Sequence, residues 1–75
     1  MSMQELIEDL RDNLKLIREK DATLSHADAR LCSEAWRWAR IDKVQDTGGN
    51  LASVRFYASH AARIAGMIAA SPANR

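Results

Sequence analysis

Apolar residues recur at helical spacing in three segments of this chain: residues 3–17, 27–44 and 51–70. Polar or glycine-containing breaks separate the segments: residues 21–24 and 46–50. This periodicity predicts α-helices and no strands. We therefore expect an all-α fold with helices at roughly residues 3–20, 26–45 and 51–70. The three would form a single helical domain, residues 1–75, with residues 71–75 as a tail.

The first segment has the strongest helix signature. Its apolar residues follow the 4-3-4-3 spacing of a heptad seam: Met3, Ile7, Leu10, Leu14 and Ile17. Ser2 and Glu5 have the spacing of a capping box, in which each side chain binds a backbone amide of the first turn. We expect this helix to pair antiparallel with the second, and the third helix to pack into their groove.

The boundaries of the other two helices are predicted from capping residues. Ser25 and Asp28 indicate the start of the second helix. Gly48 and Gly49 indicate a left-handed exit from it, with Asn50 available to cap the third helix. The third helix is apolar around most of its circumference, with a main face and an adjoining stripe of Phe56, His60 and Met67. Such a helix is typically covered on several sides.

The small size of the chain predicts association. A single core in 75 residues rarely supplies more than about 3–5 kcal/mol without a covalent or metal staple. Cys32 is the only cysteine, and Cys32, His26 and His60 do not have metal-ligand spacing. We therefore expect a homodimer that self-associates through apolar positions on the first and third helices: Leu10, Leu14, Ile17, Ile64 and Ile68. The alternative is an extended hairpin that completes a four- or six-helix bundle on dimerising.

Composition narrows the class of protein. The formal net charge is +1, and residues 47–75 contain three arginines and no acid, which is a thin footprint for nucleic acid. The N-terminal segment does not resemble a secretory signal, and the apolar run at residues 64–70 is too short to span a bilayer. We expect a cytoplasmic protein without a membrane segment. The sequence also contains no catalytic, cofactor-binding or metal-binding motif, so we expect neither an enzyme nor a bound cofactor or metal.

Two tryptophans are the sharpest local feature. Trp36 and Trp38 are two residues apart on a helix, so their side chains point about 200° apart. Trp38 shares the apolar face and is predicted to lie in the core. Trp36 lies toward the arginines, where it either forms a binding surface with them or packs within the chain, against the third helix or under Arg40. The sequence leaves both interpretations open.

The candidate partner-binding residues are therefore the tryptophan nearest the arginines and the arginine stripe of the second helix: Trp36, Arg37, Arg40 and Arg30. A solvated face is the commoner role of such a stripe, and the Arg30–Glu34 spacing partly neutralises it. The predicted function is that of a small non-catalytic interaction module. It would bind another protein and modulate it, with inhibition as the expected effect. Chains of this kind are common among accessory proteins of phages and mobile elements, which is an analogy of class.

A nucleic-acid-binding transcriptional regulator is the alternative function. It would use arginines of the second and third helices: Arg30, Arg37, Arg40, Arg55 and Arg63. The near-neutral charge and the long connection at residues 46–50 disfavour it.

Overall fold

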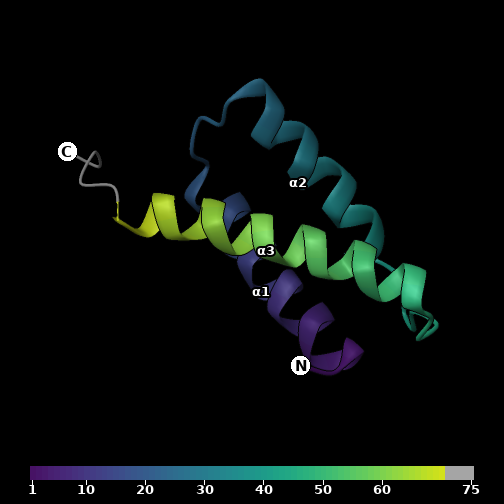
Figure 1. Ribbon diagram of the computed structural model, residues 1–75. Helices are drawn as coiled ribbons and strands as arrows, with labels where there is room; N and C mark the ends of the chain where they lie inside the picture. Colours follow the sequence, from purple (N-terminus) through teal and green to yellow (C-terminus); the bar gives the residue numbers. More distant parts are fainter. Residues whose placement is uncertain (71–75) are drawn as a thin grey trace.

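The computed structural model describes residues 1–70, which form three α-helices and no strand: α1 (Met3–Lys20), α2 (His26–Ala39) and α3 (Gly48–Ala70) (Figure 1). The three helices pack together, which confirms the predicted all-α class. Helix α3 contacts α1 and α2 more extensively than these two contact each other. The predicted tail at residues 71–75 lies outside the described residues.

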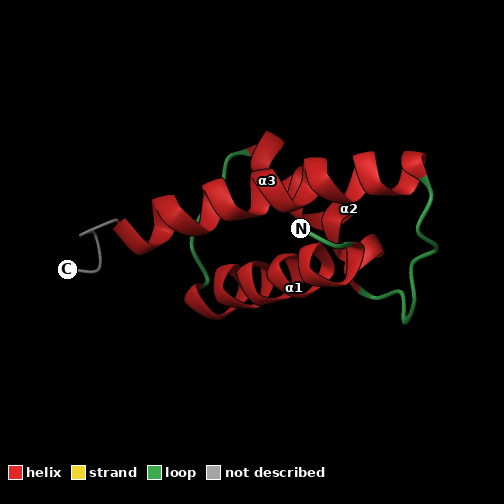
Figure 2. Cartoon of the chain, turned by 60° about the horizontal axis from the view of Figure 1, so that its bottom comes forward, coloured by secondary structure: helices red, strands yellow, loops and turns green. Residues whose placement is uncertain are grey.

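Helix α1 forms as its sequence pattern predicts. All five seam residues are buried, with Leu10 and Leu14 only 0% and 1% exposed. The capping box is present: the Glu5 amide donates to Ser2 Oγ at 3.1 Å, and the Ser2 amide donates to Glu5 Oε1 at 2.9 Å. Asp21 ends the helix in the left-handed conformation, with φ of 49°. This buried side lies along α3, and the two helices run side by side (Figure 2).

Helix α2 ends at Ala39, six residues before the predicted boundary at residue 45. Arg11 on α1 reaches this end of the helix. Its Nε donates to the Ala39 carbonyl at 2.8 Å, and its Nη2 donates to the Ile41 carbonyl at 2.9 Å. The last carbonyl groups of a helix have no partner within the helix. A side chain from α1 thus caps the C-terminal end of α2.

The two adjacent glycines begin α3, so the prediction that they end α2 is wrong. Neither Gly48 nor Gly49 has a positive φ. The helix is capped instead by Thr47, whose Oγ1 accepts from the Asn50 amide at 3.1 Å. Asn50, the predicted cap, lies inside the first turn and donates through Nδ2 to the Gln45 carbonyl at 2.9 Å. The connection between α2 and α3 is therefore residues 40–47.

Helix α3 has one covered side and one open side. It buries Val54, Ala58, Ala61, Ile64 and Ala65 against the other helices. The structure measures 43 × 21 × 17 Å, and a helix with its side chains is about 10 Å across, so the bundle is only about two helices deep. Among the described residues of a single chain, α3 is covered by α1 and α2 only, and the expectation that a second copy covers its remaining side stays a prediction. Within residues 1–70 no helix is both long enough and apolar enough to cross a membrane.

Candidate functional site

The predicted partner-binding residues fall on two different sides of α2. Trp36 faces α1, where it is half-buried and packs against the core. The Arg18 guanidinium lies 4.8 Å from the centre of the Trp36 ring, and that of Arg40 lies 5.9 Å from it. The intrachain stack under Arg40 is therefore present, and Arg18 is a second cation that the sequence reasoning missed.

The opposite side of α2 faces α3 and forms a cleft. Arg37, Trp38 and Ile41 line it from α2 and the chain just beyond. Glu34 and Tyr57 complete the lining, and the volume of the cleft is about 430 Å³. Trp38 is half-buried here, so the core position predicted for it is only partly correct. The partly exposed tryptophan that lies beside Arg37 is therefore Trp38, on the side of α2 away from Trp36.

Beyond the cleft, a chain of side-chain contacts runs along α3. The Phe56 ring packs edge-on against Tyr57, with ring centres 5.1 Å apart, and against His60, with ring centres 4.6 Å apart. Arg63 lies 3.2 Å from His60 Nδ1 and donates to the Met67 sulfur at 3.8 Å. We call this surface the α2/α3 face, and its uncharged members are Trp38, Ile41, Phe56, Tyr57, His60 and Met67.

Exposed apolar side chains are concentrated on the α2/α3 face. Four large hydrophobic residues are exposed in the described chain, and three of them lie here: Ile41 at 41%, Phe56 at 50% and Met67 at 55%. The fourth, Met1, is at the start of the chain. A contiguous apolar patch on a small protein typically marks an interaction surface.

The acids on this face are already engaged by neighbouring groups. The Tyr57 hydroxyl donates to Glu34 Oε1 at 3.0 Å, and this bond raises the pKa of Tyr57. Arg30 lies 3.9 Å from the other oxygen of Glu34. Arg63 Nη2 donates to Asp28 Oδ1 at 2.9 Å, which lowers the pKa of Asp28 and raises that of Arg63.

Arg37 is the charge on the α2/α3 face that has no partner. It forms no ion pair and no side-chain hydrogen bond with any residue from 1 to 70. Three arginines and two carboxylates lie on the face: Arg30, Arg37, Arg63, Asp28 and Glu34. With both carboxylates engaged, the charge left for a partner is positive.

The residues predicted for self-association lie elsewhere. Leu10, Leu14, Ile17 and Ile64 are inside the core of a single chain, where they hold α1 and α3 together. They are not open to a second copy unless that core separates. Ile68 is half-buried and packs at the edge of the core. A second copy would therefore need a different surface from the predicted one.

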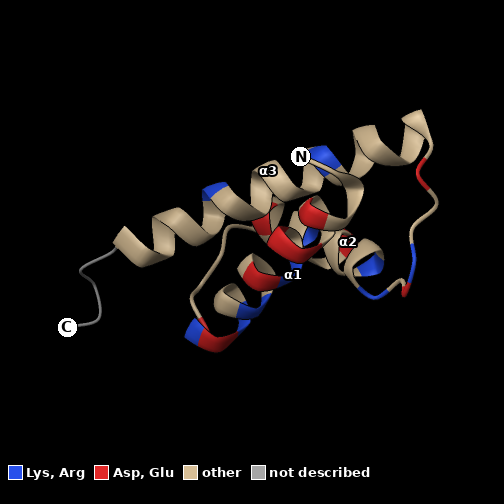
Figure 3. Cartoon of the chain, turned by 90° about the horizontal axis from the view of Figure 1, so that it is seen from below, with Lys and Arg blue, Asp and Glu red and all other residues tan. Residues whose placement is uncertain are grey.

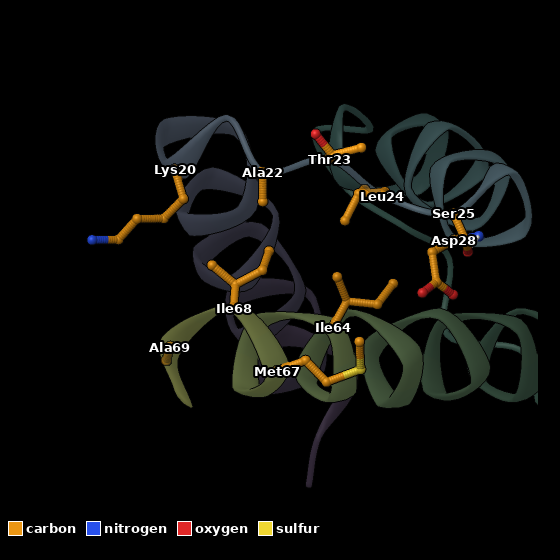
Figure 4. Close-up of a pocket in the computed structure, with 10 residues that line it drawn as sticks. All are labelled: Lys20, Ala22, Thr23, Leu24, Ser25, Asp28, Ile64, Met67, Ile68 and Ala69. Carbon is orange, nitrogen blue, oxygen red and sulfur yellow. Dashed lines mark hydrogen bonds between the residues drawn. The ribbon is translucent and has the colours of Figure 1, made fainter. Parts of the chain in front are cut away.

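Ile68 lines a second cavity, of about 530 Å³, between the last turns of α3 and the loop from α1 to α2. Ile64 and Ile68 point across it toward Ala22 and Leu24 (Figure 4). The Lys20 side chain points away from the cavity, and Asp28 at its rim is bound to Arg63. The cavity thus has apolar walls from α3 and from the loop, and Thr23, Ser25 and Asp28 add polar groups to its lining.

The five arginines of the nucleic-acid alternative do not gather on one surface. Arg40 lies beside Trp36 on the α1 side of α2, whereas Arg63, which belongs to α3, is paired with Asp28 of α2. Helix α3 carries basic residues and no acid, whereas α1 carries both signs (Figure 3). Among the described residues no group of three His, Cys, Asp or Glu side chains is placed to hold a metal ion.

Comparison of the chain with known protein families, with curated proteins and with solved structures gave no match.

Proposed function

We propose that this chain is a non-catalytic helical interaction module that binds another protein and modulates it, with inhibition as the expected outcome. The α2/α3 face would be the binding surface. One observation carries the proposal: Ile41, Phe56 and Met67 are exposed on one continuous face that also holds Trp38 and Tyr57. The kind of accessory protein that phages and mobile elements encode is the class we propose, by analogy of size and composition.

The residue types on this face support binding. Tryptophan, tyrosine and arginine are the residues most enriched at the energetic centres of protein interfaces. Trp38, Tyr57 and Arg37 line the same cleft; the two aromatic side chains are half-buried against the core, and Arg37 is exposed. Aromatic rings that are already held by neighbours lose little conformational entropy when a partner covers them. The face is therefore suited to binding by contact with no change in the fold.

Capture from native cells with matched variants tests the proposal. Phe56→Glu places a charge in the middle of the face, on a side chain that is half exposed. Ala62→Glu makes the same change in charge on the same helix, at an exposed position about 120° around it. We expect wild type and Ala62→Glu to retain the same bound protein and Phe56→Glu to lose it, with equal helical circular dichroism for all three. Equal capture by Phe56→Glu would remove the α2/α3 face as the binding surface.

The homodimer stays a prediction. It is tested by measuring the mass of the protein in solution by light scattering at several concentrations. Because the core aliphatic residues of α1 and α3 are occupied within one chain, a dimer would have to use exposed positions. A mass of one chain at all concentrations would contradict it.

A further inference from the structure

We propose that the occupant of the α2/α3 face is an acidic amphipathic helix of a different protein, held between α2 and α3. The inference rests on the proposed function and adds the chemistry of the partner. Its three steps concern the shape of the face, its charge, and the exclusion of a second copy of this chain.

Exposed apolar side chains on the face are spaced so that one more helix could pack on them. On α3, one stripe, which we call the α3 seam, is formed by Phe56, His60, Arg63 and Met67, and its two ends are the exposed apolar residues Phe56 and Met67. On α2, the neighbouring stripe, the α2 seam, is formed by Ala27, Leu31, Glu34 and Trp38. Beside the two seams, Tyr57 of α3 donates to Glu34 of α2 and joins the helices. Phe56 and Met67 are separated by about 16 Å along the axis, so the α3 seam offers about three turns of contact.

A helix placed on both seams would form the fourth member of a four-helix arrangement. Helix-in-groove recognition of this kind is made by apolar anchors at positions i, i+3 or i+4, and i+7 of the bound helix. The exposed Ile41, Phe56 and Met67 side chains are the surfaces that such anchors would cover. An amphipathic helix meets this shape requirement.

The charge on the face selects an acidic helix. Asp28 is bound to Arg63, and Glu34 is bound to Tyr57 with Arg30 nearby, so both carboxylates already have partners within the chain. Arg37 has no partner among residues 1–70. A carboxylate on the bound helix would pair with Arg37 at the edge of the cleft, where partial desolvation strengthens the attraction.

The same charges disfavour a second copy. In a two-fold contact of this face with itself, the carboxylates open to Arg37 of each copy would be Asp28 and Glu34, which already accept hydrogen bonds within their own chain. The exposed acids of this chain are mainly on α1, at Glu5, Glu8, Asp12 and Glu19. That side of α1 exposes no large apolar residue other than Met1 nearby, so it lacks the anchors that the groove requires.

Peptide selection on the intact chain tests the inference. The probe is a display library of random peptides about five helical turns long (~18 residues). The targets are wild type, Arg37→Glu, and Arg40→Glu as the matched control, because Arg40 carries the same charge on the α1 side of α2. On wild type and on Arg40→Glu we expect enriched peptides with apolar residues at helical spacing and flanking acids. On Arg37→Glu we expect a basic residue to replace the acid.

The enriched acidic peptide is then synthesised and its affinity is measured. We expect a dissociation constant about tenfold weaker for Arg37→Glu and nearly unchanged for Arg40→Glu. Phe56→Glu should abolish binding, with its helicity measured in parallel to confirm that it folds. A structural role of Arg37 alone would not reverse the charge preference of the selected peptides.

Other results would overturn the inference. Enriched peptides without acidic bias would do so, as would equal affinity of the acidic peptide for Arg37→Glu. A wild-type dimer that Phe56→Glu converts to a monomer would assign the face to a second copy. Cross-linking identifies the segment of the captured protein that contacts this face. If capture from native cells depends on Phe56 but that segment is not acidic, this inference fails and the proposed function stands. If native capture does not depend on Phe56, the proposed function fails as well.

Discussion

The two sides of α3 are built differently. On one side it packs against α1, which has six buried side chains, all of them large and apolar: Met3, Leu6, Ile7, Leu10, Leu14 and Ile17. On the other side it packs against α2, which has only three buried residues, and these are small: Cys32, Ala35 and Ala39. The large side chains of α2 lie at its flanks, half exposed. Most of the apolar burial that stabilises the fold is therefore in the α1/α3 half, whereas the α2/α3 half keeps its large apolar groups available at the surface.

This contrast separates residues that hold the fold from residues that can bind. Replacing a seam residue of α1 should reduce stability, and replacing an exposed residue of the α2/α3 face should reduce binding alone. The substitutions below test that separation.

Leu14→Ala should have the largest effect. Leu14 is 1% exposed and lies in the α1/α3 core, so its truncation leaves a cavity and costs about 2–5 kcal/mol. A core of this size supplies about 3–5 kcal/mol in total, so the variant should be largely unfolded at 25 °C. Urea denaturation followed by circular dichroism measures this. Phe56→Ala is the matched change on the other half and should shift the free energy of unfolding by no more than about 0.5 kcal/mol. Similar losses in both variants would contradict the contrast.

Arg11→Met should have the next largest effect. It keeps the aliphatic stem of the side chain and removes the two hydrogen bonds to the Ala39 and Ile41 carbonyls. Because these bonds join α1 to the end of α2, we expect a loss of about 1–2 kcal/mol. Lys15→Met, one turn further along α1 and exposed, is the control and should change little. An equal response of the two variants in urea denaturation would show that the Arg11 bonds contribute nothing.

Asp21→Gly should stabilise the chain. Asp21 holds a left-handed φ of 49° at the end of α1, a conformation that glycine adopts without the steric penalty of a Cβ atom. We expect a gain of up to about 1 kcal/mol in the free energy of unfolding. Asp21→Ala removes the same carboxylate but keeps a Cβ atom, so it should give no gain. If both variants gain equally, the charge and not the conformation is responsible.

Asp28→Asn should have the smallest effect, and that effect depends on pH. The hydrogen bond from Arg63 lowers the pKa of Asp28 below its usual 3.8 in the folded chain. The ionised carboxylate therefore stabilises the fold at pH values above 3.8, and this contribution is lost as the pH falls through the lowered pKa. Wild type should exceed Asp28→Asn in stability at neutral pH, and the difference should shrink below pH 3.8. A difference that stays constant from neutral to acid pH would contradict this linkage.

The sequence predicted α1 fully because everything that defines this helix is local. Its seam, its capping box and the break at Asp21 all lie within about twenty consecutive residues. The end of α2 could not be predicted in the same way, because Arg11 lies 28 residues before the carbonyl that it binds. The glycine pair was misassigned for a related reason: Thr47, directly before it, supplies the capping hydroxyl. Helical periodicity also does not tell how many neighbours a helix has, so it could not predict which side of α3 is left open by α1 and α2.

The candidate site was predicted in part. Arg37 and Arg30 were named, but they were grouped with Trp36, which the structure places on the opposite side of α2 beside Arg18. Sequence reasoning had placed Phe56, His60 and Met67 in one stripe without assigning them to binding. The missed signal was the matching heptad-like spacing on α2 and α3. The hydrogen bond from Tyr57 to Glu34 engages one of the two carboxylates of the face. It could not be predicted from the sequence, because the fold brings these two helices together.

The bridge made by Arg11 has a consequence for mutational scanning. The Arg11 guanidinium binds the backbone carbonyl of Ile41, and Ile41 lines the cleft between α2 and α3. Arg11 therefore controls where this exposed isoleucine lies, although Arg11 itself is not part of the cleft. In a screen for loss of binding, position 11 would therefore score beside true contact positions. Only a paired readout of abundance and binding would separate such an indirect hit from a residue that touches the ligand.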